Sequence, residues 1–304
     1  MADFRFIVTK EEDGMEARVL MRRHFDFSSR LRGRIKREKR LLRNGSPVEG
    51  FHKLREGDVI TVDLPEETSH FAPEDIPLIP VYEDEDLLVL NKPAGIVVHP
   101  TKGHLSGTVA NALAHRMKVT GEVYKIRFIN RLDMDTSGLL AVAKNAYVQT
   151  DYMRQQDRGE VIKTYTCLAH GIVEEEQGVL DFPIAPPLPD EKRRRVHPSG
   201  APSLTRYRVL ERFSSAEYGD YCLLRLRLET GRTHQIRVHL AHIGHPVVGD
   251  SLYGPEAESH APALIGRQAL HASSLAFVHP TKKEELRLEA PLPDDFLSAI
   301  DLLR

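Results

Sequence analysis

Hydrophobic and polar residues alternate along most of the chain in short runs, which are bounded by Gly, Pro, Asn and Asp. Beyond residue 80, four runs have the length and composition of β-strands: Leu87–Leu90, Lys163–Ala169, Arg206–Glu211 and Tyr221–Leu228. Three others carry helical periodicity: Thr108–Met117, Ala146–Arg158 and Thr233–Ile243. The strands outnumber the helices and lack the regular alternation of a parallel βαβ sheet. The pattern therefore predicts an α+β fold built on a mixed, mainly antiparallel sheet.

The N-terminal part has a pattern of its own. In Ser28–Arg43, leucine and isoleucine recur at helical spacing among eight basic residues, which predicts an amphipathic helix with a basic outer face. Asn44-Gly45 then predicts a hairpin turn, and Val59–Val62 predicts a short strand. These elements indicate a small α+β domain that precedes the larger sheet. A merely solvated helix face is the alternative explanation of the basic run.

An acidic, proline-rich segment separates the two patterns. Leu64–Asp86 contains eight acidic residues, four prolines and no Lys or Arg, so neither a helix nor a hydrogen-bonded strand is favoured. We expect a stiff spacer here or, for its latter half, an ordered strap along the second domain. With 304 residues the chain is long enough for two domains. The predicted boundaries are 1–66 for the first domain, 67–80 for the linker and 81–304 for the second domain.

Charge and cysteine content restrict the class of protein. The formal net charge of -2 excludes a global polycation, although Met1–Asp63 holds 15 Lys and Arg against 11 Asp and Glu. A second basic cluster, Lys192–Arg195, falls in a predicted loop and is a candidate phosphate contact. Two cysteines are too few for a disulfide framework, and no apolar run has the length of a membrane span. These features predict a cytoplasmic protein without membrane contact.

The segment from Arg127 to Lys144 concentrates the candidate chemistry. Apolar runs flank a polar loop that contains Asn130, Arg131 and Asp133 and ends at Gly138. A loop held between buried strands presents its polar side chains to the surroundings. Asp133 is therefore a candidate catalytic carboxylate, and a local ion pair between Arg131 and Asp133 is the structural alternative.

Four histidines between residues 234 and 245 raise the question of a metal site. Such a site needs converging ligands, yet the sequence has no HExxH, and His234 and His239 are five residues apart. We therefore predict no metal and no cofactor. Asp133-Met134-Asp135-Thr136 is similar to the D-x-D-x-T motif of haloacid-dehalogenase-type phosphatases, which bind magnesium. That fold needs a parallel βαβ sheet, which the strand pattern does not predict.

Three motifs far apart in the chain combine into one signature. They are Asn130-Arg131-Leu132-Asp133 with Thr136-Ser137-Gly138, Lys163-x-Tyr165, and Thr230–Ala241 with Gly249-Asp250-x-x-Tyr253-Gly254. The flanking pieces Asn91-Lys92-Pro93-x-Gly95 and Leu270-His271-Ala272 agree with them. The set resembles the RluA/RluD-type pseudouridine synthases over roughly residues 80 to 291. One position departs from that pattern, because the family usually has His where this chain has Asn130.

The resemblance implies a chemistry and the residues that perform it. Pseudouridine formation breaks the glycosidic bond of a uridine, rotates the freed uracil and rejoins it through ring carbon five, without a cofactor. Asp133 corresponds to the carboxylate that attacks the anomeric carbon or removes a neighbouring sugar proton, and Arg237 to its salt-bridge partner. Tyr165 corresponds to the tyrosine beside the base, and Arg131 to the arginine that fills the space of the extruded nucleotide. Further candidate substrate contacts are Asn130, Arg232, His234 and Gln235.

Arg232, His234 and Gln235 are equally well explained as a cap of the helix that follows them.

In the first domain, six positions after the basic run fit one further pattern: Gly45, Val48, Leu54, Gly57, Asp58 and Ile60. This pattern resembles the alpha-L RNA-binding domain of ribosomal-protein type, which implies a module that grips structured RNA.

Together the two resemblances imply an RNA pseudouridine synthase that acts on large-subunit ribosomal RNA. Transfer RNA is the alternative substrate, and a non-catalytic RNA-binding factor is the alternative from another class. RNA is the expected partner. No obligate protein partner is inferred, and a monomer is expected.

Overall fold

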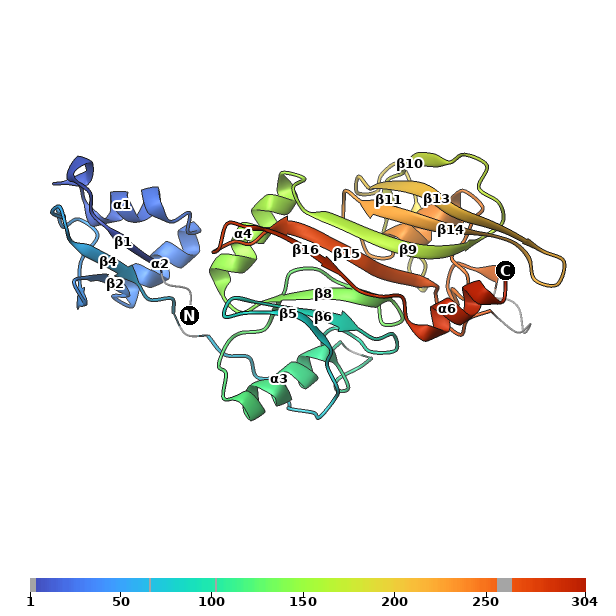
Figure 1. Cartoon of the computed structure of the whole chain (residues 1–304), viewed down its shortest axis with the longest axis horizontal. Coiled ribbons are helices and arrows are strands. Elements are labelled where there is room, and N and C mark those ends of the chain that lie inside the picture. Colours follow the sequence, from blue (N-terminus) through green and yellow to red (C-terminus); the bar gives the residue numbers. More distant parts are fainter. Residues whose placement is uncertain (1–3, 66, 102, 256–263) are drawn as a thin grey trace.

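The computed structural model describes residues 4–65, 67–101, 103–255 and 264–304, which form two main sheets with their helices (Figure 1). The N-terminal sheet has four strands in the order β1-β4-β2-β3. These antiparallel strands are β1 (Phe4–Ile7), β2 (Leu41–Arg43), β3 (Ser46–Pro47) and β4 (Val59–Val62). The helices beside them are the 3-10 helix η1 (Lys10–Glu12), α1 (Ala17–His24) and α2 (Ser29–Arg37).

The basic helix of this domain is shorter than the sequence pattern indicated. α2 ends at Arg37, and the prediction that it continues to Arg43 is wrong. Lys39 adopts a φ of 53°, and the Arg40 N–H donates to the carbonyl of Ile35 at 2.9 Å. This is the Schellman arrangement, which closes a helix with one residue in the left-handed conformation. Glycine usually takes that position, so a lysine there gave no sign that the helix stops.

The second sheet has ten strands and confirms the mixed, mainly antiparallel α+β fold. Eight strands follow the order β10-β13-β14-β9-β15-β8-β6-β5, while β16 pairs with β15 and β7 pairs with β8. Among the described pairs of this sheet, only β8 and β15 run parallel. The strands are β5 (Pro80–Glu83), β6 (Leu87–Lys92), β7 (Arg127–Phe128), β8 (Ser137–Ala143), β9 (Ile162–His170), β10 (Gln177–Asp181), β13 (Leu204–Ser215), β14 (Gly219–Leu228), β15 (Leu270–Val278) and β16 (Glu285–Glu289). A separate ribbon pairs β11 (Ile184–Ala185) with β12 (Arg195–Val196).

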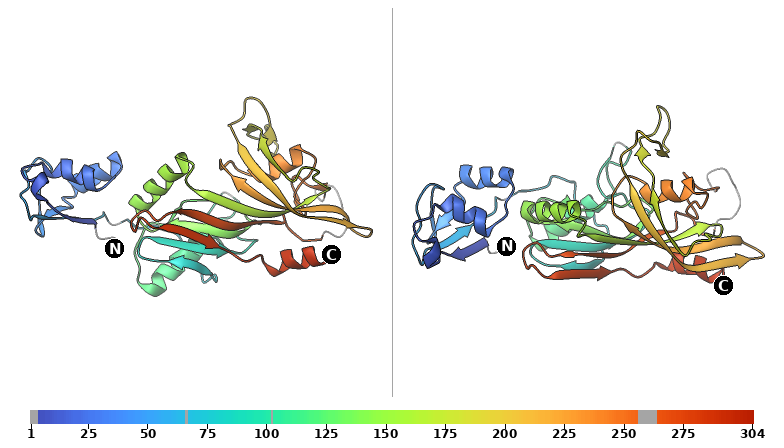
Figure 2. Two further views of the ribbon diagram at one scale, coloured as in Figure 1. Left: turned by 45° about the horizontal axis from the view of Figure 1, so that its top comes forward. Right: turned by 90° about the horizontal axis from the view of Figure 1, so that it is seen from above.

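Helices cover both faces of the large sheet. α4 (Ala146–Asp157) and α5 (Gln235–His242) lie on one face, which we call the front face, and α3 (Val109–Thr120) and α6 (Asp294–Asp301) lie on the back face (Figure 2). The core is apolar on both sides, because the central strands β6 and β8 are buried along almost their whole length. None of the described helices combines the length and the apolar composition needed to cross a membrane.

The acidic segment between the domains is ordered along the second domain. The side-chain amide of Asn111 donates to the carbonyl of Ala72 at 2.8 Å, and the Glu74 N–H donates back to the carbonyl of Asn111 at 3.1 Å. Phe71 and Ile76 pack on the core of the large sheet. From Phe71 onward the segment is therefore a strap and not a free spacer. The prediction that it forms no hydrogen-bonded strand is wrong at its end, because β5 pairs with β6. The boundary expected at residue 66 lies outside the described residues.

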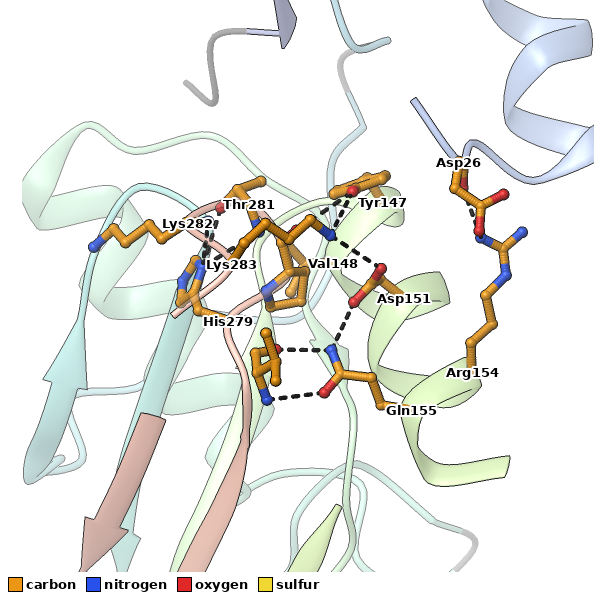
Figure 3. A network of polar contacts seen from close by, with 12 residues as sticks. Asp26, Tyr147, Val148, Asp151, Arg154, Gln155, His279, Thr281, Lys282 and Lys283 are labelled. Atoms are coloured by element: carbon orange, nitrogen blue, oxygen red, sulfur yellow. Dashed lines mark hydrogen bonds and ion pairs between the residues drawn. The ribbon is translucent and has the colours of Figure 1, made fainter. Parts of the chain in front are cut away.

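The N-terminal domain contacts the large sheet through α4. The rings of Phe4 and Phe27 meet the ring of Tyr147 edge-on, with centroids 4.9 and 5.6 Å away. The Arg154 guanidinium donates to the carbonyl of Asp26 at 2.7 Å and forms an ion pair with its carboxylate (Figure 3). These contacts place the first domain against the N-terminal and outer parts of α4.

The same helix is fixed to the sheet by polar contacts. The Gln155 side chain exchanges two hydrogen bonds with the backbone of Val278, of 2.7 and 2.9 Å (Figure 3). Lys283 donates to the Tyr147 hydroxyl at 3.2 Å. α4 is therefore a rigid bridge between the N-terminal domain and the front face of the sheet.

Candidate active site

The polar loop that carries Asp133 joins β7 to β8 at the front face. Gly138 is the second residue of β8 and has a φ of 106°. A Cβ atom at this position would lie 2.3 Å from the carbonyl oxygen of Ala272 on β15, so only glycine allows the two strands to approach this closely. The close packing of β8 against β15 therefore requires glycine at this position.

Asp133 meets Arg237 although 104 residues separate them in the chain. The Arg237 guanidinium donates to Asp133 Oδ2 at 3.0 Å. Its other two nitrogens donate to the carboxylate of Asp250, Nε to Oδ2 at 2.7 Å and Nη2 to Oδ1 at 2.8 Å. Arg237 is thus clamped between two carboxylates, one at the cavity and one behind it. This geometry holds the head group in one orientation.

The inner carboxylate of this clamp is fully buried. Burial alone would raise the pKa of Asp250, but its hydrogen bonds to Arg237 and to the amides of Leu252 and Tyr253 hold that pKa below its usual value. Burial would lower the pKa of Arg237, and the two carboxylates raise it instead. Arg237 therefore stays charged, and it faces Asp133 with a fixed positive charge.

One cavity of about 320 Å³ collects the predicted site residues on the front face, between α4 and α5. Asp133 reaches it with 27% of its side chain exposed, so the carboxylate is accessible as well as paired. Tyr165 is buried beneath it, and burial together with the charge of Asp133 raises the pKa of its hydroxyl. All eight predicted residues line this cavity: Asn130, Arg131, Asp133, Tyr165, Arg232, His234, Gln235 and Arg237.

His234 occupies a strained position at the start of α5. Its φ of 58° lies in the left-handed region, which is unusual for a residue other than glycine. One ring nitrogen lies 3.0 Å from the Tyr253 hydroxyl, and the other lies 3.8 Å from Asp133 Oδ2. Burial lowers the pKa of His234, so the ring is neutral at pH 7 and adds a polar wall without a second positive charge.

Two of the predicted substrate contacts are engaged with the protein backbone. The amide of Asn130 donates to the carbonyl of Leu139 at 2.9 Å and accepts from the N–H of Ala141 at 2.7 Å. The amide of Gln235 donates to the carbonyl of Leu204 and accepts from the N–H of Arg232, both at 3.0 Å. Asn130 therefore ties the loop to β8, and Gln235 braces the start of α5.

Arg131 and Arg232 are the exposed cations of the cavity. Arg131 makes no hydrogen bond or ion pair with any residue in the described part of the chain. Arg232 makes one hydrogen bond through its side chain, a long one of 3.3 Å to the carbonyl of Pro202. Both side chains are free to contact a ligand at the mouth of the cavity.

Lys92 supports the loop, although no role was predicted for it. The residue is 1% exposed, and its ammonium group donates to the carbonyls of Pro93, Ile96 and Met134 at 2.7, 2.9 and 2.8 Å. Burial lowers the pKa of Lys92 to about 7 despite the nearby charges of Asp135 and Asp133. The Asn91-Lys92-Pro93-x-Gly95 motif marked this position as part of the signature. It did not indicate burial, because a lysine before such a turn is usually expected to lie in solvent.

The geometry of the described residues matches neither a metal site nor a phosphatase-type site. Within the described ranges no three His, Cys, Asp or Glu residues converge as metal ligands, and both ring nitrogens of His239 are hydrogen-bonded to Thr205 and Phe182. The similarity to the phosphatase motif was overstated, because Thr136 directly follows Asp135 and a serine occupies the fifth position. β8 also lies between an antiparallel and a parallel neighbour, outside any βαβ unit.

Comparisons with known proteins agree with this geometry. The chain is 42% identical over 254 residues to "Ribosomal large subunit pseudouridine synthase D" of Pasteurella multocida (strain Pm70), a match that covers 81% of this chain and 76% of that protein. It is 42% identical over 265 residues to "Uncharacterized RNA pseudouridine synthase YlyB" of Bacillus subtilis (strain 168), covering 86% and 84%.

A solved structure, "Human RNA Pseudouridylate Synthase Domain Containing 1", has 30% sequence identity and a TM-score of 0.57, covering 73% of this chain and 86% of that chain. The family model "RNA pseudouridylate synthase" matches residues 86–242, which include the Asp133 loop, β9 and α5. The chain therefore belongs to the RNA pseudouridylate synthase family, whose enzymes isomerise uridine to pseudouridine in RNA.

Proposed function

We propose that this enzyme modifies uridines of large-subunit ribosomal RNA and that Asp133 is its catalytic carboxylate. The choice of RNA is supported by the name of the relative from Pasteurella multocida, and transfer RNA is the competing substrate. We further propose a monomer that acts in the cytoplasm. The role of Asp133 is supported by one observation above all. Its carboxylate opens into the cavity while the fixed Arg237 guanidinium lies 3.0 Å behind it.

The pairing with Arg237 suits a carboxylate that must react while ionised. A partly buried carboxylate tends to take up a proton, and a neighbouring guanidinium opposes this. The ionised group attacks the anomeric carbon of the uridine or removes a neighbouring sugar proton. On either route the bond from the anomeric carbon to the ring nitrogen breaks, and the uracil turns. When ring carbon five then bonds to the anomeric carbon, the ester bond to Asp133 breaks on the first route, and the removed proton returns to the sugar on the second. The proton on ring carbon five leaves last.

Two other side chains are placed to hold the extruded uridine. Tyr165 lines the cavity, and its ring offers a face against which uracil can stack. Its raised pKa keeps the hydroxyl protonated and uncharged at neutral pH. Arg131 is exposed at the mouth and is suited to occupy the space that the nucleotide leaves in the RNA. Extrusion of a base costs a few kcal/mol, which such contacts must offset.

The N-terminal domain is proposed to grip the RNA outside the cavity. Between α1, α2 and the turn at Phe51 lies a groove of about 650 Å³. Phe51 is 64% exposed and can stack on an unpaired base. Cations along the groove suit contacts to phosphates. They are Arg18, Arg22, Arg32, Lys36 and Lys39.

Pseudouridine mapping across total RNA from cells with and without the gene tests this proposal. We expect sites in large-subunit ribosomal RNA to disappear and to return with the wild-type gene but not with Asp133→Ala. Loss of sites only in transfer RNA would reassign the substrate. If no site changed, the chain would act as a non-catalytic RNA-binding factor instead. If Asp133→Ala restored all sites, the assignment of Asp133 as the catalytic carboxylate would be wrong.

A further inference from the structure

Four arginines form a compact basic surface on the sheet face opposite the cavity. The pairing of β13 with β14 (Figure 1) places Arg206 directly opposite Arg227, and Arg208 directly opposite Arg225. In the pairing of β14 with β9, Tyr165 lies opposite the residue between Arg225 and Arg227. Tyr165 lines the cavity on the front face, and side chains alternate along a strand, so these arginines point to the back face. We call them the arginine quartet.

The stability of the sheet does not explain the quartet. Like charges directly opposite each other on antiparallel strands are destabilising. Glu229 offsets part of this repulsion, because its Oε1 lies 3.1 Å from the Nε atoms of both Arg206 and Arg227. Arg208 and Arg225 are exposed and contact no acceptor or carboxylate among the residues that the structure covers. One bound carboxylate for four guanidinium groups leaves a cationic surface on a chain of net charge -2.

The quartet is continuous with the rim of the cavity. β14 ends at Leu228, and Leu228, Gly231 and Arg232 all line the cavity. Between them the chain crosses the end of the sheet at Thr230, whose hydroxyl accepts from the Leu204 N–H at the start of β13. A strand of RNA that leaves the cavity past Arg232 therefore first meets the end of the sheet where β14 ends and β13 begins. It then reaches the back face.

We propose that the arginine quartet binds the sugar–phosphate backbone of the substrate RNA, in a stretch that flanks the modified uridine and wraps around the sheet edge. This inference rests on the proposed function only in taking RNA as the ligand. RNA is favoured over an acidic protein because the surface centres on four guanidinium groups, and the exposed apolar side chain beside it, Val179 opposite Arg206, lies on the edge strand β10. Stable protein interfaces instead centre on buried apolar or aromatic residues. Guanidinium groups bind phosphate through paired hydrogen bonds.

The test compares the full-length wild-type protein with the double variant Arg208→Gln/Arg225→Gln, which leaves both contacts to Glu229 in place. Dissociation constants are measured over a series of salt concentrations for a long RNA hairpin and for a short single-stranded oligonucleotide that contains uridine. For the hairpin we expect binding to weaken about tenfold at physiological salt. The slope of log K against log salt should fall by about two, one for each lost phosphate contact. Binding of the short oligonucleotide should not change.

A control variant, Lys118→Gln/Arg287→Gln, removes two positive charges elsewhere. For the RNA hairpin, its slope of log K against log salt should equal the wild-type value. The melting temperature of the quartet variant should equal or exceed that of the wild type, since repulsion is relieved. A lower melting temperature with an unchanged slope would assign the quartet a structural role. An unchanged slope together with the loss of binding to an acidic protein would assign it to a protein partner. Both outcomes would overturn the proposal while leaving uridine isomerisation intact.

Discussion

The active-site cavity and the groove of the N-terminal domain are both lined by cations, but the cation beside the reactive carboxylate is held in place, whereas two of those in the groove are not. Arg237 is 7% exposed and binds a carboxylate on each side, so its position is fixed before any ligand arrives. In the groove, Arg22 and Lys36 have no hydrogen bond or ion pair with a described residue. The cavity is therefore preorganised for chemistry, where small displacements are costly. The groove suits an adaptable electrostatic grip.

The largest effect should follow from Asp133→Asn, which removes the reactive charge and keeps the shape. We expect product formation to fall by about 10⁴-fold or more, because a neutral amide can neither attack the sugar nor accept its proton. Release of tritium from ring carbon five of labelled RNA measures this, and RNA affinity should stay close to the wild-type value. Asp135→Asn is the matched control and should act within a few-fold of the wild type. An equal loss in both variants would contradict the assignment of Asp133.

The next effect concerns the clamp around Arg237. Arg237→Met leaves Asp250 buried and unpaired, and breaking a buried ion pair in this way costs about 3–5 kcal/mol. We expect the free energy of unfolding, measured in urea, to fall by that amount, and activity to be lost. If the free energy of unfolding stayed within about 1 kcal/mol of the wild-type value, the Arg237–Asp250 ion pair would not be what fixes Arg237 in the cavity.

A second substitution separates stability from chemistry at the same site. In Arg237→Met/Asp250→Asn the buried charge is gone, and the asparagine oxygen still accepts from the amides of Leu252 and Tyr253. We expect this variant to recover about 2 kcal/mol of the lost stability, since a neutral buried pair avoids the cost of an uncompensated charge. Activity should not return. Recovered activity would show that Asp133 works without the guanidinium.

A smaller effect is expected from the groove. Arg22→Gln/Lys36→Gln should weaken binding of a structured RNA about tenfold and reduce the salt slope by about two. The rate of the chemical step in single-turnover assays at saturating RNA should not change, because neither side chain lines the cavity. A slowed chemical step with unchanged affinity would reverse the division of labour between the two regions.

The sequence predicted the cavity better than the support around it. Short motifs were enough to bring Asp133, Tyr165 and Arg237 together, because each lies at a fixed place in a strand, loop or helix that the hydrophobic pattern also predicts. The roles of Asp250 and Lys92 could not be assigned in this way. Their importance depends on burial and on carbonyls or guanidinium groups from distant segments, which the spacing of residues does not reveal.

Sequence reasoning was less accurate where a residue has a structural role that its type does not usually indicate. Lys39 ends α2 in a conformation that usually calls for glycine, so the helix was predicted six residues too long. Asn130 was predicted as a substrate contact because of its place in a motif, and it lines the cavity. Its bonds to Leu139 and Ala141 give it a structural role that the motif did not indicate.

The smallest effect is expected at Asn130. Asn130→His keeps a ring nitrogen that can donate or accept but cannot do both with the geometry of an amide, so one of the two bonds to β8 is lost. Losing one hydrogen bond of this kind costs about 1 kcal/mol, and activity should stay within about threefold of the wild type. Asn130→Ala loses both bonds and should cost about twice as much. Urea unfolding and single-turnover rates measure the two quantities. A large loss of activity in the histidine variant without a loss of stability would mean that the amide contacts RNA directly, which its bonds to β8 argue against.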